Sequence, residues 1–439
     1  MIHDAALTWH LLQEARRSSR RPAAWFRRRQ ESQLRHLLRH AYDRVPLYRR
    51  LYDQAGFHPD AFQTLADLER IPPLTKAELK GADPLETIAS GTDPASCTVL
   101  STSGSTGMPM QIMLGRYERC WNRAVAWRIL FEHGFRWTDR TLEIRMDPGE
   151  SYAIQRFGIA PKDWMLILDP PEVWAECLAE KRHECVVAGA GTLEILAEAA
   201  QGKKICPPRL VISDSEPLTP LSRAGIRQAL GSDPIDVYGL EEVSNFAWEC
   251  EHRHGLHVSA DSHIVEVAAP VGDVGLLTVT ALGMWTMPFI RYETGDMAQA
   301  TGHACPCGRT LPLLEAVHGR AIDSIELPGG RRLLWPYFHE ILGAQPEVVQ
   351  WQVVQTSVAE IVVKTVLRTP DPLGPARLKT ALLSHSPRDL RIEVQPVAAI
   401  PLEANGKRRL VIPFSAIGTP DSPTHRELGS IGAGESLNR

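Results

Sequence analysis

The chain of 439 residues lacks the features that mark several other protein classes. It has no run of 18 or more apolar residues, so the sequence predicts no membrane-spanning segment. Its arginine-rich N-terminal stretch, residues 16–29, is not followed by an apolar segment and a cleavage site, so we do not expect this stretch to be a secretory signal. The formal net charge of -4 predicts no general attraction to nucleic acid or to anionic membranes. We therefore expect a cytoplasmic protein.

Cysteine is also scarce, and no internal repeat is present. Eight cysteines in this length are too few for a disulfide-based scaffold. The composition, 44% hydrophobic and 23% charged, is that of an ordinary globular protein. The length allows two domains, or one large and one small.

Apolar runs and helical periods alternate along much of the chain. The predicted strands are residues 98–100, 164–168, 185–189, 210–212 and 235–238, and the predicted helices are 119–132, 173–180, 192–200 and 221–230. This alternation is typical of crossover units in a largely parallel sheet. Ligands of such sheets bind beyond the carboxyl ends of the strands. Polar segments at residues 213–216 and 238–239 follow two of these ends.

The flanking regions differ from this pattern. Leu34, Leu37, Leu38, Ala41 and Tyr42 have the spacing of an amphipathic helix, which Pro46 ends. Thr75 and Glu78 form a capping box that starts another helix.

The second half begins β-rich, from residue 257 to 300, with the clearest strand at 276–280. Helices at 335–342 and 376–383 and strands at 348–354, 360–367 and 390–394 then predict a small α+β domain.

A loop rich in hydroxyl groups and glycine follows residues 98–100, a short β-branched and apolar run that predicts a buried strand. Its residues are Ser101, Thr102, Ser103, Gly104, Ser105, Thr106 and Gly107. Glycine lets successive backbone N–H groups converge on one anion, and Ser and Thr add donors. It is not a Walker loop, because no Gly-Lys-Ser/Thr closes it. An ordinary surface loop is the competing interpretation, since Gly/Ser clusters often mark turns.

Four stretches in order resemble the adenylate-forming superfamily, in particular its phenylacetate–CoA ligase-like branch. They are the glycine loop, Tyr-Gly-Leu-Glu-Glu at 238–242, Arg-Tyr-Glu-Thr-Gly-Asp at 291–296 and Gly-Lys at 406–407. Segments 45–48 and 71–76 also look like this branch, and the resemblance spans about residues 30–412. It implies an ATP-dependent enzyme that converts a carboxylic acid into an acyl-adenylate with release of pyrophosphate. An aromatic acid is one candidate substrate. The acyl group then passes to a thiol of CoA or of a carrier protein.

The resemblance also implies an α/β fold and a domain organisation. We expect a large N-terminal domain with mostly parallel sheets and a β-rich subdomain, followed by a small mobile α+β domain. The predicted boundaries are 1–95 for an N-terminal helical region packed on the large domain, 96–320 for the adenylation core, 321–415 for the C-terminal lid and 416–439 for a disordered tail. The lid is expected to swing about residues 322–323, and a homodimer is compatible with the sequence.

By the same resemblance, individual residues receive roles. The loop from Ser101 to Gly107 would hold the phosphates, Glu242 would position Mg²⁺, and Asp296 would accept hydrogen bonds from the ribose. Lys407 would bridge the carboxylate and the α-phosphate, although most lysines in such loops are simply exposed. The adenine pocket and its surroundings would involve Tyr238, Gly239, Ser215, Glu216, Pro217 and Arg320.

Two positions depart from the family pattern. The glycine loop usually continues with Lys-Pro, but here it continues with Met108-Pro109, so one phosphate-neutralising charge is missing. Glu241 stands where Thr or Ser is usual, and a second carboxylate near a triphosphate is unfavourable. These departures leave alternatives open: activation of another oxyacid, transfer to an amine, or a degenerate nucleotide-binding protein without ligase activity.

A separate group of residues suggests a metal. Cys250, His257, Cys305 and Cys307 form a Cys₃His set suited to tetrahedral structural Zn²⁺. His252 and His254 compete as the fourth ligand, and three free thiols in a polar loop are the simpler alternative. The resemblance favours zinc, because some members of the branch bind a structural metal near Cys-x-Cys-Gly-Arg.

Overall fold

The computed structural model describes residues 2–101, 110–146, 153–271, 274–320, 324–327, 332–333, 335–386, 390–403 and 408–414. The chain divides into two compact units. The first comprises residues 1–218 and 222–317, and the second comprises residues 219–221 and 318–439. Each unit is described by itself below.

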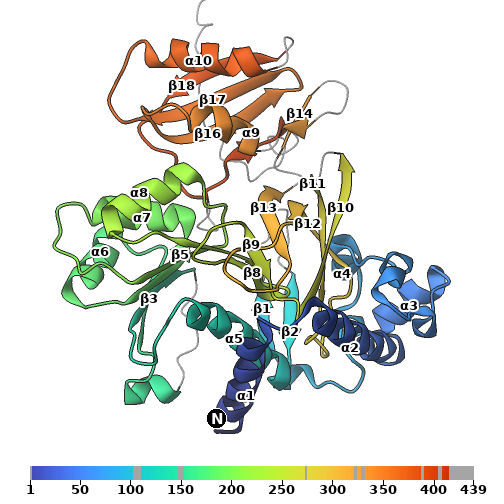
Figure 1. Cartoon of the computed structure of the whole chain (residues 1–439). Helices are drawn as coiled ribbons and strands as arrows, with labels where there is room; N and C mark the ends of the chain where they lie inside the picture. Colours follow the sequence, from blue (N-terminus) through green and yellow to red (C-terminus); the bar gives the residue numbers. More distant parts are fainter. Residues whose placement is uncertain are drawn as a thin grey trace, which may run out of the picture. The chain divides into compact units, whose positions relative to one another are not determined.

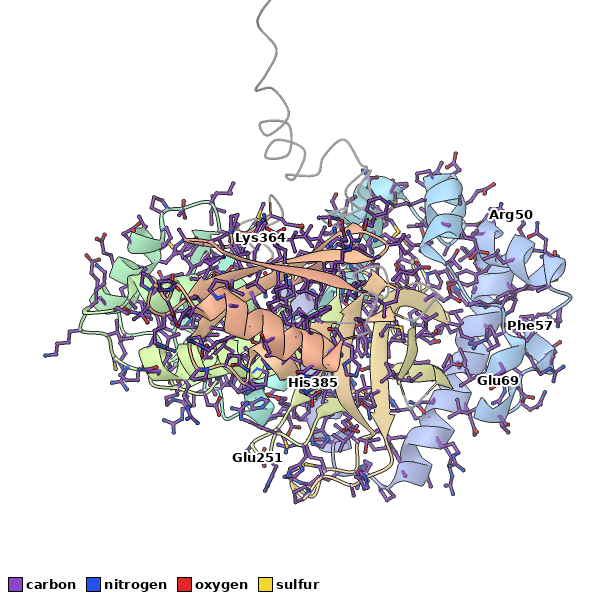
Figure 2. All side chains as sticks on the ribbon, turned by 90° about the horizontal axis from the view of Figure 1, so that it is seen from above. Arg50, Phe57, Glu69, Glu251, Lys364 and His385 are labelled. Carbon is purple, nitrogen blue, oxygen red and sulfur yellow. The ribbon has the colours of Figure 1, made fainter. Side chains whose placement is uncertain are left out.

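The first unit begins with helices. These are α1 (Ile2–Ser18), α2 (Ala23–Arg44), α3 (Pro46–Gln54) and α4 (Lys76–Gly81), with short 3₁₀ turns at Pro59–Ala61, Leu65–Arg70, Pro84–Glu86 and Pro94–Ser96. The predicted apolar positions Leu34, Leu37, Leu38 and Ala41 of α2 are fully buried. Helix α2 ends one residue before Val45, and α3 begins at Pro46, because proline cannot continue the preceding hydrogen-bond pattern. Arg50, Phe57 and Glu69, labelled in Figure 2, belong to this region.

A hairpin of β1 (Thr98–Ser101) and β2 (Gln111–Leu114) follows. We predicted a buried strand at 98–100, and the burial part of that prediction is wrong. The residues of β1 alternate between half-buried and exposed, and among the described residues β1 pairs with β2 in an antiparallel two-stranded sheet. An apolar β-branched run therefore indicated the strand but not how much of it would be covered.

An eleven-stranded sheet forms the centre of the first unit, in the order β10-β11-β12-β13-β9-β8-β7-β6-β5-β3-β4. One half is parallel and contains β3 (Thr141–Arg145), β4 (Lys162–Leu166), β5 (Cys185–Gly189), β6 (Leu210–Asp214) and β7 (Ile235–Leu240). The helices α5 (Arg116–Glu132), α6 (Pro171–Glu180), α7 (Ala190–Ala199) and α8 (Pro220–Leu230) and a 3₁₀ turn at Ala153–Phe157 connect or precede these strands. The predicted crossover pattern is thus confirmed.

The other half of the sheet, from β7 onward, contains antiparallel strand pairs. Its strands are β8 (Ser244–Glu249), β9 (Leu256–Val258), β10 (His263–Val271), β11 (Val274–Ala281), β12 (Tyr292–Thr301) and β13 (Leu313–Arg320). Figure 1 shows α6 and α7 beside the parallel strands, and α2 and α4 beside the antiparallel ones. The two halves meet at β7 and β8.

Both faces of the parallel half are covered. Val186 of β5 and Val211 of β6 pack with α6, α7 and α8 on one face. Cys185 and Val187 of β5 lie in a different buried cluster that includes Ile129 of α5. Successive strand residues point to opposite faces, so an unbroken apolar run is what a sheet covered on both sides requires.

The second unit contains a four-stranded sheet in the order β18-β17-β16-β19. Its strands are β16 (Val348–Ser357), β17 (Glu360–Leu367), β18 (Arg391–Pro396) and β19 (Val411–Ile412), with α9 (Trp335–Leu342), α10 (Gly374–His385) and a small sheet of β14 (Ile325–Glu326) and β15 (Arg332–Leu333). Lys364 on β17 and His385 at the end of α10 are labelled in Figure 2. Among the described residues, no helix is long and apolar enough to cross a membrane. The predicted α/β fold class is confirmed.

Candidate active site

Charged side chains close the carboxyl ends of the parallel strands. Arg145, the last residue of β3, makes a bidentate ion pair with Asp214, the last residue of β6, with Nη2 2.7 Å from Oδ2 and Nη1 3.2 Å from Oδ1. Its Nε donates to Glu143 over 2.9 Å, and Glu143 also accepts from Lys162. Burial disfavours the charge of Arg145, but the two carboxylates outweigh burial and raise its pKa. This network fixes the ends of β3 and β6, from which the predicted adenine-pocket segment continues.

That segment has a constrained backbone. Ser215 has φ +67°, a left-handed conformation that is uncommon for a non-glycine residue. The next side chain, Glu216, turns back so that its Oε2 accepts from the N–H of Gly191 over 2.8 Å, in the first turn of α7. A carboxylate is stabilised at a helix N-terminus. The Glu216 carboxylate therefore holds the segment 215–217 in place.

The ribose-site prediction falls on an irregular part of β12. Gly295 has φ +79°, and the pairing with β11 slips between Leu276 and Thr278. Bulges of this kind redirect side chains and often occur next to active sites. The backbone N–H of Asp296 donates to Thr294 Oγ1 over 3.0 Å. This hydrogen bond fixes the backbone position from which the Asp296 side chain extends.

Tyr238 and Asp296 come together in the structure. The Tyr238 hydroxyl donates to Asp296 Oδ2 over 2.6 Å, from β7 to β12. Burial and the neighbouring carboxylate of Asp296 raise the pKa of Tyr238 well above its ordinary value, so the phenol remains a donor at neutral pH. Two residues selected from separate motifs thus form one hydrogen-bonded pair, and Tyr238 orients the carboxylate.

Glu242 forms a second arrangement of this type. It is buried, and its Oε1 accepts from the hydroxyl of Tyr292 over 3.0 Å. The ammonium of Lys76, the first residue of α4, lies 3.8 Å from the same oxygen. The neighbouring Glu241, by contrast, is exposed, where water screens its charge.

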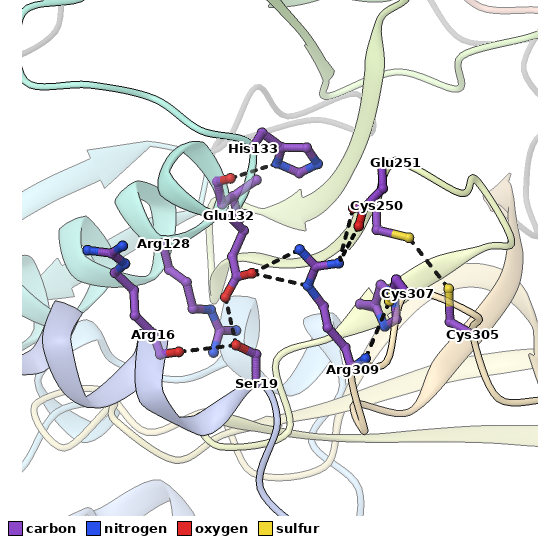
Figure 3. Close-up of polar contacts among 12 residues, drawn as sticks. Arg16, Ser19, Arg128, Glu132, His133, Cys250, Glu251, Cys305, Cys307 and Arg309 are labelled. Atoms are coloured by element: carbon purple, nitrogen blue, oxygen red, sulfur yellow. Dashed lines mark hydrogen bonds and ion pairs between the residues drawn. The ribbon is translucent and has the colours of Figure 1, made fainter.

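The four predicted metal ligands converge near the end of β8. The ligand atoms of Cys250, His257, Cys305 and Cys307 all lie within 4.8 Å of one another. Cys250 Sγ is 3.5 Å from Cys305 Sγ, and Cys307 Sγ is 3.3 Å from His257 Nε2. Four ligands at about 2.3 Å from a tetrahedral centre are separated by about 3.8 Å, so these spacings suit zinc. Figure 3 shows Cys250 and Cys305 pointing toward one another.

Backbone donors support the sulfur atoms of this cluster. The N–H of His252 donates to Cys250 Sγ, and the N–H of Arg309 donates to Cys307 Sγ. Burial works against the Cys307 thiolate, but these Arg309 contacts outweigh it and lower the pKa of Cys307. Burial lowers the pKa of His257 to about 4, so its imidazole is neutral and able to coordinate at pH 7. The Arg309 guanidinium is itself neutralised by Glu132 and Glu251 (Figure 3).

The sequence of this chain is similar to those of phenylacetate–coenzyme A ligases. No model of a protein family matches it. A phenylacetate–coenzyme A ligase from Thermus thermophilus is 30% identical over 358 residues, which cover 76% of this chain and 79% of that protein. The corresponding enzyme from Escherichia coli is 27% identical, covering 68% and 72%. This chain belongs to the phenylacetate–CoA ligase family. The prediction of an AMP-forming acid ligase that works through an acyl-adenylate is confirmed at the level of the family.

Solved structures agree with the fold of this ligase. A 2-hydroxyisobutyryl-CoA ligase in its postadenylation state matches with a TM-score of 0.77 and 21% identity over 94% of both chains. An anthranilate–CoA ligase bound to anthranoyl-AMP matches with a TM-score of 0.58 and 15% identity, covering 78% of this chain and 69% of that one. At these identities the comparison supports the adenylate-forming fold alone.

The structure places only part of the predicted site of this ligase. Ser101 ends β1 and is exposed, and Arg320 ends β13 and is half-buried. Gly239 lies in β7, where an added Cβ would be 2.4 Å from Asn245 Cα, so only glycine fits. Thr102, Ser103, Gly104, Ser105, Thr106, Gly107 and Lys407 lie outside the described residues.

Two residues of this arrangement were not predicted. Lys76 and Tyr292 lie in segments that resemble the family, 71–76 and 291–296, but no role was predicted for either residue. The sequence feature that could have indicated a role for Lys76 is the resemblance of segment 71–76 to the family. The proximity of this segment to Glu242 could not be derived from a local sequence pattern.

Proposed function

We propose that this ligase activates a carboxylic acid with ATP and Mg²⁺ and transfers the acyl group to the thiol of CoA. The observation that carries the proposal is the Tyr238–Asp296 hydrogen bond, which joins the predicted adenine and ribose residues in one site. Membership in the phenylacetate–CoA ligase family supports the acid and the acceptor. A carrier-protein thiol or an amine remains the alternative acceptor. The reaction would take place in the cytoplasm. The enzyme would be a monomer or a homodimer, and measurement of its molar mass by light scattering would distinguish the two.

Each predicted residue then has a defined task. Tyr238 would stack on adenine through its ring while its hydroxyl orients Asp296 toward the ribose, and segment 215–217 with Gly239 would line the pocket. Glu242 would position Mg²⁺, which supplies Lewis-acid polarisation of the phosphates when bound. The loop 101–107 would donate to the phosphates, and Arg320 would contact the ribose–phosphate region.

The C-terminal domain would act as a lid. In this proposal residues 321–415 swing about residues 322–323, so that Lys407 reaches the reacting carboxylate in one position and the acceptor enters in the other. Such a movement lets one cavity serve two half-reactions. The predicted hinge at 322–323 and the predicted tail at 416–439 lie outside the described residues.

The zinc site would be structural. Cys250, His257, Cys305 and Cys307 would hold one Zn²⁺, and three thiolates with one imidazole leave no ligand position for substrate. The ligand pairs flank the sequence that contains β12, so the metal would stabilise the part of the sheet that presents Asp296.

Pyrophosphate release with a panel of carboxylic acids, followed by mass spectrometry of the acyl-CoA, tests the proposal. We expect release only when an acid is present, and no release with any acid would favour a degenerate nucleotide-binding protein. Product formed with an amine but not with CoA would identify the alternative acceptor.

Asp296→Ala should weaken ATP binding, because the ribose loses a charge-assisted acceptor worth about 1.5–3 kcal/mol. Calorimetry measures this change, and an unchanged affinity would remove Asp296 from the ribose role.

Lys407→Ala should slow adenylate formation about a hundred- to thousandfold while ATP binding is nearly unchanged, since its charge would act in the transition state. Wild-type rates of pyrophosphate release in this variant would contradict the assignment.

A further inference from the structure

A segment far upstream of the predicted site lies against the start of β12. Leu74 pairs with Tyr292: the N–H of Leu74 donates to Arg291 O, and the N–H of Glu293 donates to Leu74 O, each over 2.9 Å. Arg291 adds a contact from its Nη1 to Ile71 O over 2.6 Å and an ion pair with Glu266. Segment 71–75 is therefore attached along the strand that carries Tyr292 and Asp296.

This attachment places the first residue of α4 at the site. Thr75 caps the helix, with Glu78 completing the capping box as predicted, so the backbone of Lys76 begins from a fixed position. The Lys76 side chain is half-buried, and its ammonium lies 3.8 Å from Glu242 Oε1, the oxygen that also accepts from Tyr292. Lys80 lies on the same short helix but is exposed.

The predicted nucleotide site has few positive charges to balance the negative charges of a triphosphate, and Lys76 lies where it could supply one. The glycine loop carries hydroxyl groups and no cation, because Met108 stands where the family has lysine. The buried Glu242 adds a carboxylate close to where a triphosphate would bind. A triphosphate next to carboxylates requires compensating positive charge.

We propose that Lys76 supplies the positive charge at the β- and γ-phosphates of ATP that the glycine loop lacks. The inference rests on the proposed nucleotide site, since Lys76 would contact the phosphates from its position beside Glu242. The contact is specific to the triphosphate, because AMP has no β- or γ-phosphate. Lys76 is thus assigned as a nucleotide-contacting residue that acts with Glu242.

Calorimetric titration of Lys76→Met with ATP and, separately, with AMP tests this assignment. Methionine keeps most of the length of the side chain and removes the charge. We expect ATP affinity in the presence of Mg²⁺ to fall about ten- to hundredfold, as for the loss of one charge-assisted contact. AMP affinity should change less than about twofold, because the affected phosphates are absent from AMP.

Lys80→Met is the matched control, since it removes a charge from the exposed face of the same helix, and it should leave both affinities unchanged. Lys76→Arg should retain more ATP affinity than Lys76→Met and serves as the test variant if Lys76→Met fails to fold. Equal losses of ATP and AMP affinity, or an unchanged ATP affinity, would overturn the inference. Failure of the wild-type protein to bind either nucleotide would instead overturn the proposed function.

Discussion

Two clusters in the first unit bring ligand-type atoms equally close together but differ in what they can bind. In one, Cys250, His257, Cys305 and Cys307 converge, and in the other, Asp163, Cys177 and His183 do so. In both clusters these atoms lie within 4.8 Å of one another. Proximity of ligand atoms therefore does not separate them.

The surroundings of the clusters do separate them. Three nitrogen atoms lie close to the carboxylate oxygens of Asp163: Lys181 Nζ at 2.9 Å, His183 Nε2 at 2.9 Å and Arg140 Nη1 at 3.1 Å. A divalent ion would have to displace two cations from this carboxylate. The sulfur atoms of the first cluster receive backbone N–H groups instead, and the nearby Arg309 is paired with Glu132 and Glu251. Neighbouring charges, and not the spacing of the donor atoms, therefore distinguish these two clusters.

The largest expected difference between the clusters is in zinc content. Elemental analysis of purified wild-type protein should find about one zinc per chain, as a four-ligand structural site requires. Cys305→Ser should lose that zinc, lower the free energy of unfolding by about 4 kcal/mol or more, and weaken ATP binding, because loss of a structural metal is among the most destabilising single changes. Cys177→Ser is the matched control from the other cluster and should keep the zinc. Zinc-free wild-type protein, or normal melting and normal ATP binding of Cys305→Ser, would leave the first cluster as ordinary thiols.

A smaller effect should come from the charge of Asp163. Burial would raise its pKa, but hydrogen bonds from Lys181, His183 and Arg140 outweigh burial and lower it to about 2 from 3.8. A depressed pKa stabilises the folded protein above the unfolded-state value, and this contribution is lost as pH falls from about 4 toward 2. Asp163→Asn should therefore cost about 2 kcal/mol at pH 7, at 1.36 kcal/mol per pKa unit.

Urea unfolding of this variant between pH 7 and pH 3 measures the effect. The difference from wild type should be constant above about pH 5 and should narrow in more acidic solution. A pH-independent difference would show that packing, and not charge, accounts for the loss. Zinc content should be unchanged, and a fall would contradict the separation of the two clusters.

The smallest effect should come from Lys181→Ala. The Lys181 side chain is 49% exposed, and exposed ion pairs contribute only about 0.2–1 kcal/mol. Unfolding at low and high salt should show a loss within that range which diminishes as salt increases. A loss comparable to that of Asp163→Asn would mean that Lys181 carries most of the network by itself.

Local periodicity determined much of the fold from the sequence. The predicted strands 185–189 and 360–367 and the helix 335–342 agree with β5, β17 and α9 in both bounds. These elements are regular because burial on one or two faces imposes a repeat that a short window contains. The capping box of Thr75 and Glu78 was equally predictable, since its hydrogen bonds join residues three positions apart.

Coverage of an element was less predictable. The run at 98–100 forms a strand, but β1 lies in a two-stranded sheet with β2 in the part of the chain that the structure describes, and it stays partly exposed. Strand β4 ends at Leu166, two residues before the predicted end, and Leu168 is among the exposed apolar residues. An apolar run shows that burial would be favourable, whereas the surface that provides it comes from elsewhere in the chain.

The order of the motifs in the sequence was sufficient to predict the family and the site residues Tyr238, Asp296 and Glu242. Only the tertiary structure decided which residues contact them. The Tyr238–Asp296 and Tyr292–Glu242 hydrogen bonds, and the ammonium of Lys76 beside Glu242, each join segments that are distant in sequence. The same is true of the cations around Asp163. Hydrogen bonds and ion pairs act over a few ångströms, so their partners are set by which loops the packed sheets bring together. Local periodicity in the sequence does not show which distant segments will come into contact.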